Sequence, residues 1–129
     1  MNDLAATRRF WSGVLGCAEG RSSERWVDFN LFGHQIVAHL CPRVAGVKFG
    51  SNLVDGRQVP VPHFGVVLTM PQWEALAERL RAAGAQFLIE PTVRFRGQPG
   101  EQATFFVLDP SGNALEFKAF ADGRQLFAK

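Results

Sequence analysis

The chain has 129 residues, of which 47% are hydrophobic and 20% are charged, and its formal net charge is +2. This length is enough for one domain with a substantial core. The small net charge and the lack of a Lys/Arg cluster argue against nucleic-acid binding. No apolar run reaches the length of a membrane span, and the first residues lack the apolar core of a signal peptide, so we expect no membrane partner.

The two cysteines, Cys17 and Cys41, follow the end of a predicted helix and the end of a predicted strand. They are too few and too far apart for a CxxC zinc motif. We interpret them as free thiols rather than a disulfide, which favours a reducing, cytoplasmic location.

The first half begins with an amphipathic helix over residues 3–15, with Asp3 as its N-cap and Gly16 as its end. A short, weak strand follows, and then two clear strands that meet near Gly33. These three predicted strands cover residues 17–24, 25–32 and 34–40. Residues 42–62, which carry three glycines and three prolines, are predicted to be a long connector.

The second half begins with a strand and continues with a helix that has Pro71 in its first turn and Gly84 at its end. Its predicted elements are a strand over 63–70, a helix over 71–83, and strands over 87–95, 103–109 and 113–120. The sequence DPSGN at 109–113 suits a tight turn. The tail, residues 121–129, is too short and mixed to assign.

The two halves repeat each other. Each has a helix that ends in glycine and each closes with a hairpin, which indicates an internal duplication. We therefore divide one domain over 1–129 into module one (1–41), the connector (42–62), module two (63–120) and the tail (121–129). The first half lacks a counterpart of the strand over 63–70, because the sequence begins at the helix.

The strand alternation places two polar residues of module two on one face. His63 and Glu116 both lie on the face opposite the bulky apolar side chains. By the register of the repeat, His39 lies on the corresponding face of module one. Two imidazoles and a carboxylate are the ligand types of a facial-triad metal site with open coordination positions.

At this point the sequence resembles the vicinal oxygen chelate superfamily, which includes glyoxalase I, extradiol dioxygenases, fosfomycin-resistance enzymes and bleomycin-resistance proteins. The resemblance covers residues 3–120. It depends on four stretches: DLAATRRFWSGVLGC, GHQIVAHL, PHFGVVL and DPSGNALEFKAF. It implies an α+β fold in which paired βαβββ modules form curved mixed sheets around a cavity.

The resemblance also implies site residues. His63 falls at the ligand position of the first strand of module two, and Glu116 at that of its last strand. His39 lies near the ligand position of the last strand of module one. The remaining ligand position is on the strand that this sequence lacks, so we expect a divalent ion (Fe, Mn, Zn or Ni) that is weakly bound or absent.

Plainer interpretations of the same residues remain open. His63 could simply start a strand after Pro62, and His39 could be an interior histidine bonded to a carbonyl group. Glu116 could pair with Lys118 or Arg94 on an open sheet face.

Two functions are therefore kept. The first is a metal-dependent enzyme, in which Glu116 is both a ligand and a proton-transfer group and a small-molecule substrate binds the ion through two oxygens. The reaction would be that of a glyoxalase-like lyase or isomerase, a ring-cleaving dioxygenase, or an enzyme that adds a thiol to an epoxide. The second is a metal-free protein that sequesters an antibiotic-like molecule, as in the bleomycin-resistance branch. In either case we expect a homodimer, because the missing strand leaves one edge of residues 34–40 open.

Overall fold

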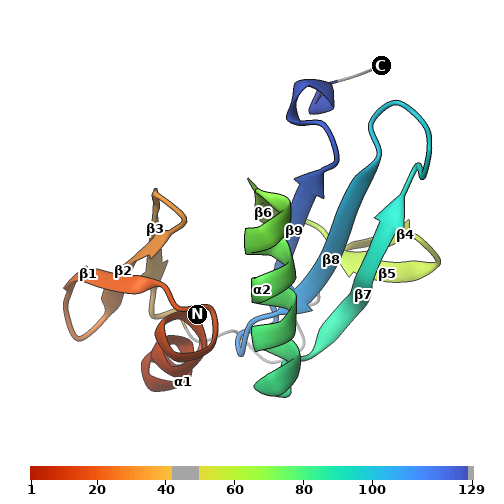
Figure 1. The fold of residues 1–129 in the computed structure, drawn as a ribbon. Helices are drawn as coiled ribbons and strands as arrows, with labels where there is room; N and C mark the ends of the chain where they lie inside the picture. Colours follow the sequence, from red (N-terminus) through yellow and green to blue (C-terminus); the bar gives the residue numbers. More distant parts are fainter. Residues whose placement is uncertain (42–49, 128–129) are drawn as a thin grey trace. The chain divides into compact units, whose positions relative to one another are not determined.

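The computed structural model describes residues 1–41 and 50–127, and their contacts divide them into two compact units. The first unit comprises residues 1–41 with the turn 109–113, and the second comprises residues 50–108 with 114–127. Residues 42–49 of the predicted connector and 128–129 of the tail lie outside the described part. The predicted α+β class is confirmed (Figure 1).

The helix of the first unit has two parts, α1 (Leu4–Arg8) and a π-helical turn, η1 (Arg9–Val14). Asp3 caps it as predicted, because its Oδ1 accepts a hydrogen bond from Ala6 N. In η1 the bond from Leu15 N to Phe10 O spans five residues. The sequence predicted the helix at 3–15 but not this change of pitch.

A three-stranded antiparallel sheet completes the first unit. Its strands, in the order of the sheet, are β1 (Ala18–Ser22), β2 (Trp26–Leu31) and β3 (His34–His39). Val27, Phe29 and Leu31 of β2 are buried, and Trp11 of η1 stacks on Phe29 with 5.4 Å between ring centroids. The helix thus covers the sheet face that carries Phe29, and the opposite face is left uncovered by it.

Met1 lies beside the end of β3. Its amino group donates to His39 O at 2.9 Å, and Cys41 N donates to Met1 O at 2.8 Å. This pair of bonds is the pattern of a parallel bridge between Met1 and Leu40. Apart from this bridge, the outer edge of β3 has no neighbouring strand among the described residues, as the sequence predicted.

The second unit contains a four-stranded mixed sheet in the order β6-β9-β8-β7. The sheet comprises β6 (Phe64–Leu68), β7 (Phe87–Arg94), β8 (Gln102–Leu108) and β9 (Ala114–Phe120). The neighbouring strands β6 and β9 are paired in parallel, whereas the β9–β8 and β8–β7 pairs are antiparallel. Helix α2 (Met70–Ala82) connects β6 to β7. A short turn, η2 (Gly123–Gln125), follows β9.

Helix α2 lies against one face of this sheet (Figure 1). Its buried side chains are Trp73, Leu76, Ala77 and Leu80. Trp73 packs beside Phe105, and its Nε1 donates to Phe117 O at 3.0 Å. The sequence predicted this stripe except that Ala83 is exposed and Ala77 takes part instead.

Within the predicted connector the structure shows a hairpin that the sequence analysis missed. It consists of β4 (Ser51–Val54) and β5 (Arg57–Pro60). Val59 is fully buried in a small cluster with Ile89, Phe106 and Ala114. The turn depends on Asp55 at φ 46° followed by Gly56 at φ 74°, which is the left-handed pair of a tight hairpin.

Candidate functional site

The candidate site lies on the face of the four-stranded sheet that α2 leaves open. Residues paired across β8 and β9 point to the same side of the sheet, and the register pairs Phe106 with Glu116 and Thr104 with Lys118. Phe105 and Phe117 form the opposite, helix-covered face. The predicted placement of Glu116 away from the helix is therefore what the structure shows.

His63 and Glu116 come together on this face. His63 Nε2 lies 4.0 Å from Glu116 Oε2, and the His63 ring meets Phe106 edge-on with 5.2 Å between centroids. His63 Nδ1 lies 3.2 Å from Pro60 O. Because a carbonyl oxygen can only accept a hydrogen bond, Nδ1 is the donor in this contact, and Nε2 is the ring nitrogen on the side of Glu116.

Glu116 has a side chain that is only 15% exposed, and its two oxygens have different surroundings. Oε1 lies 3.3 Å from both Thr104 Oγ1 and Lys118 Nζ. Oε2 faces His63. The alternative pairing with Lys118 that the sequence left open is thus present, whereas Arg94 pairs instead with Asp55, through Nε at 2.6 Å.

A pocket of about 200 Å³ adjoins this group and is lined by residues of β6 and β9, including Gly65, Glu116 and Lys118. Gly65 is opposite Glu116 in the parallel register. The absence of a side chain at Gly65 lets the β6 backbone approach β9 closely at this position. The pocket gives a small ligand access to the Glu116 carboxylate.

An imidazole nitrogen and a carboxylate oxygen, the groups that His63 and Glu116 present on this face, are common metal ligands. The 4.0 Å between Nε2 and Oε2 is about twice a metal–ligand bond of 2.0–2.2 Å, so the two side chains must move slightly closer for one ion to bind both at the angle of such a site. A backbone carbonyl that accepts from the other ring nitrogen, as Pro60 O does here, is the usual outer partner of a metal-bound imidazole. In the part of the chain that the structure describes, no group of three or more His, Cys, Asp or Glu side chains suited to hold a metal is found.

His39, the third predicted ligand, belongs to the first unit. It is exposed at the end of β3, paired with Trp26. The register puts it on the same side of its sheet as Asp28 and Asn30, the side opposite the helix. This agrees with the predicted face, and its participation in a site with His63 and Glu116 stays a prediction.

The sequence analysis did not identify Pro60 and Thr104 as part of this group. Pro60 acts through a main-chain oxygen, for which sequence carries no side-chain signal. Thr104 could have been found, because it is a polar residue amid the apolar run of β8 and alternates onto the same face as Phe106.

The sequence and the fold can be compared with known proteins. A family model described as the Glyoxalase/Bleomycin resistance protein/Dioxygenase superfamily matches residues 1–117. The chain belongs to this superfamily. The resemblance noted from the sequence motifs is thereby confirmed.

Solved structures of this superfamily match nearly the whole chain. A glyoxalase/bleomycin resistance protein/dioxygenase from Alicyclobacillus acidocaldarius is 29% identical with a TM-score of 0.79, covering 98% of this chain and 90% of that one. The fosfomycin resistance protein FosX from Listeria monocytogenes is 17% identical with a TM-score of 0.64, covering 97% and 89%. The second likeness concerns the fold alone. No curated protein matches the chain.

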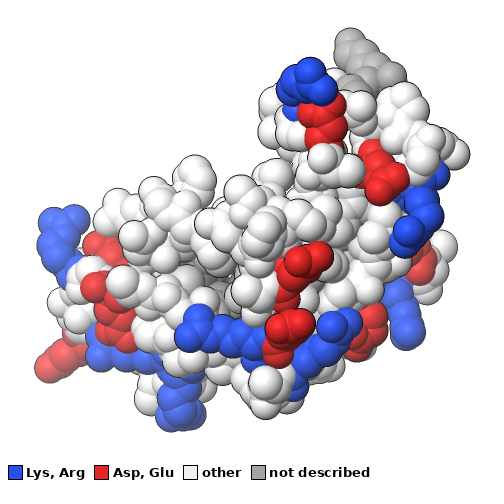
Figure 2. All heavy atoms as spheres, in the orientation of Figure 1, with Lys and Arg blue, Asp and Glu red and all other residues white. Residues whose placement is uncertain are grey.

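Two further features of this superfamily member bear on its partners. Lys and Arg side chains are interspersed with Asp and Glu on the face that Figure 2 shows, without a large basic area. Among the described residues, no helix is long and apolar enough to cross a membrane.

Proposed function

We propose that this chain is a metal-dependent enzyme that acts on a small molecule held through two neighbouring oxygen atoms. The observation that carries the proposal is the arrangement of His63 Nε2 and Glu116 Oε2, 4.0 Å apart, with the histidine ring oriented by the contact of Nδ1 with Pro60 O. Members of this superfamily commonly bind divalent metal ions and small molecules, which supports the same interpretation.

In this proposal His63 and Glu116 hold the ion, and His39 is the candidate for a third ligand. When bound, the ion supplies a Lewis acid that stabilises negative charge developing on the substrate oxygens. Glu116 also serves as the proton-transfer group, since its carboxylate borders the pocket. Lys118, 3.3 Å from Glu116 Oε1, lines the same pocket, and its positive charge offsets that of the carboxylate.

We propose three candidate reactions for this enzyme: isomerisation of a hemithioacetal, ring opening of a catechol, and addition of a thiol to an epoxide. We further propose that the protein is cytoplasmic and dimeric. Cys17 and Cys41 form no disulfide in the described part of the chain, which supports a reducing compartment.

The test is a metal titration by isothermal calorimetry with Mn²⁺, Zn²⁺, Ni²⁺ and Fe²⁺, together with elemental analysis of the purified protein. We expect one weak site per chain that is lost in His63→Ala and in Glu116→Gln. His34→Ala and Glu90→Gln are matched controls, because both residues are exposed and lie outside this group. Equal binding by the wild type, the site variants and the controls would rule out the proposal.

A second function rests on one observation. Lys118 already neutralises Glu116, and no third donor joins the pair among the described residues. A carboxylate that is already paired with a lysine, with no complete set of metal ligands, is what we expect of a metal-free protein that binds and sequesters a small molecule. It is supported if all four ions fail to bind while the protein stays folded by circular dichroism.

A further inference from the structure

The first unit has a pocket whose lining residues are not those used above. It has a volume of about 490 Å³ and is lined by residues of β1, β2 and β3, including Arg21, Asp28 and Gln35. This volume is in the range of small-molecule sites. All of its lining residues belong to the first unit, so the pocket does not depend on the His63–Glu116 pair.

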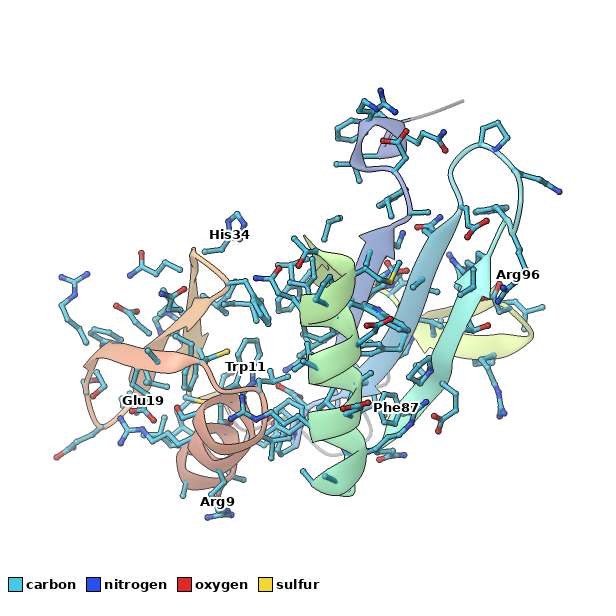
Figure 3. All side chains as sticks on the ribbon, in the orientation of Figure 1. Arg9, Trp11, Glu19, His34, Phe87 and Arg96 are labelled. Atoms are coloured by element: carbon cyan, nitrogen blue, oxygen red, sulfur yellow. The ribbon has the colours of Figure 1, made fainter. Side chains whose placement is uncertain are left out.

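The alternation of β2 explains why a charged residue lies in this pocket. Val27, Phe29 and Leu31 turn toward the helix and are buried, which leaves Asp28 and Asn30 on the other side. Asp28, Asn30 and Gln35 line the pocket from that side. Glu19 of β1 and His34 of β3, which are labelled in Figure 3, also line it, although they pair with Phe29 and Leu31 of the helix-facing side.

Asp28 is a buried carboxylate with few partners. The residue is 5% exposed, and its Oδ2 accepts a hydrogen bond of 2.9 Å from Gln35 Nε2. Among the described residues, the cation paired with it is Arg21, whose Nε lies 3.7 Å from Oδ2, beyond hydrogen-bonding distance. A carboxylate removed from water in this way gains from a closer cationic partner.

Arg21 is held only loosely. Its side chain is 84% exposed, and an ion pair with so exposed a partner contributes little stability. The other lining carboxylate, Glu19, is already engaged by Ser12 Oγ at 2.9 Å and Arg8 Nε at 3.4 Å. Asp28 is therefore the charged group with which a ligand in the pocket can pair. A ligand can displace the Arg21 side chain from Asp28 at a small cost in free energy.

Gln35 supplies a second acceptor beside this carboxylate. Because its Nε2 donates to Asp28, its Oε1 is the remaining polar atom of the amide, and Oε1 accepts no hydrogen bond within the described residues. A carboxylate and an amide oxygen next to each other match a group with several N–H donors. Ammonium and guanidinium ions have this chemistry.

We infer that this pocket binds the primary ammonium or guanidinium group of a small molecule. The cation takes the place of the Arg21 side chain beside Asp28 Oδ2 and donates a second hydrogen bond to Gln35 Oε1. An anionic ligand is disfavoured because it would lie beside the buried carboxylate of Asp28. The arginine among the lining residues, Arg21, is too exposed to offset that repulsion.

The experiment uses benzylammonium and butylguanidinium as probes, with benzyl alcohol and benzoate as the neutral and anionic counterparts of the first. Binding is followed by amide chemical shifts in ¹H–¹⁵N NMR spectra of the full chain. We expect both cations, but neither counterpart, to shift amides of residues 18–35 in a saturable way. Asp28→Asn should weaken the binding at least tenfold.

Arg21→Ala is the decisive second variant, because an exposed side chain can be removed without loss of folding. If Arg21 competes with the ligand, its removal should tighten cation binding several-fold. His63→Ala should leave cation binding unchanged, which separates this test from that of the metal site. The inference is overturned if benzoate or benzyl alcohol binds as well as benzylammonium, if neither cation shifts residues 18–35, or if Arg21→Ala does not tighten binding.

Discussion

Gly65 and Glu116 face each other across adjacent parallel strands so closely that no side chain fits between them. A Cβ atom built on Gly65 would lie 1.5 Å from the carbonyl oxygen of Glu116 and 2.5 Å from its carbonyl carbon. The obstacle is backbone, which cannot turn aside as a side chain can. The position of Glu116 in the candidate site therefore depends on glycine at residue 65.

The first prediction follows from this contact. Gly65→Ala must push β6 away from β9, and such overpacking costs about 1–3 kcal/mol. We expect the variant to have a lower melting temperature by calorimetry and to lose metal binding together with the displaced Glu116. Gly13→Ala is the control, because a Cβ there meets nothing within 4 Å. Unchanged stability and metal binding in Gly65→Ala would contradict the close approach.

Most of the second unit could be predicted from sequence, because the periodicity of apolar residues was strong. The predicted helix at 71–83 is α2, Met70–Ala82, and the predicted strand at 113–120 is β9, Ala114–Phe120. Alternation along β9 was enough to place Glu116 on the uncovered face. The hairpin at 51–60 was missed because its strands are short and only Val59 is buried.

The candidate site was predictable only where a side chain breaks an apolar pattern. His63 and Glu116 gave that signal, and so did Asp28 in the stretch WVDFNL, which the sequence analysis did not use. The role of Pro60 was not predictable, because it depends on a carbonyl group that the fold brings 3.2 Å from His63 Nδ1. The ion pair of Arg94 with Asp55 likewise joins residues that are 39 positions apart.

The second prediction concerns Lys118 as a competitor of the metal ion. Its ammonium group neutralises Glu116 and repels a divalent cation bound nearby. Lys118→Gln should therefore raise the affinity for Mn²⁺ or Zn²⁺ several-fold in a calorimetric titration. Arg57→Gln removes one positive charge from an exposed position on β5 and should leave the affinity unchanged. An affinity that falls in Lys118→Gln would mean that Lys118 organises the site rather than competing for it.

The third prediction concerns the ion pair that attaches the β4–β5 hairpin to β7. Asp55 Oδ2 accepts from Arg94 Nε at 2.6 Å, and the Arg94 side chain is only 19% exposed. Asp55→Asn keeps a residue that tolerates the left-handed backbone but removes the charge. We expect faster amide hydrogen exchange in residues 51–60 and a loss of about 0.5–1 kcal/mol. In a double-mutant cycle, Arg94→Met should add little once Asp55 has been replaced, whereas additive losses would show that the two residues act separately.

The fourth prediction is a pH dependence at the turn η2. Hydrogen bonds from the side chain and then the backbone N–H of Arg124 hold the pKa of Asp122 below its usual value. The charged carboxylate therefore supports the turn at neutral pH, and that support fades only as the pH falls through the lowered pKa. NMR titration of the Asp122 carboxyl carbon measures it directly. Arg124→Met should return the midpoint toward the usual value, and a midpoint that does not move would exclude Arg124 as the cause.

The fifth prediction concerns the open edge of β3 and the dimer. The bonds between Met1 and the main chain of His39 and Cys41 show that His39 turns its backbone away from β2. By alternation, Gln35 and Val37 turn their N–H and C=O groups to the same outer edge. An edge of this kind is a template for another strand, and we expect the strand of a second copy of the chain to occupy it.

Val37→Pro tests this edge, because proline removes one outward N–H while an edge strand on its own tolerates it. We expect the wild type to be a dimer by light scattering at micromolar concentration and Val37→Pro to be a folded monomer. Val37→Thr keeps the N–H and a β-branched side chain, so it should remain dimeric. Because Val37 is 45% exposed in the single chain, the loss of its side chain alone has little effect on the monomer. A monomeric wild type, or a dimer that persists in Val37→Pro, would show that β3 does not pair with a second copy.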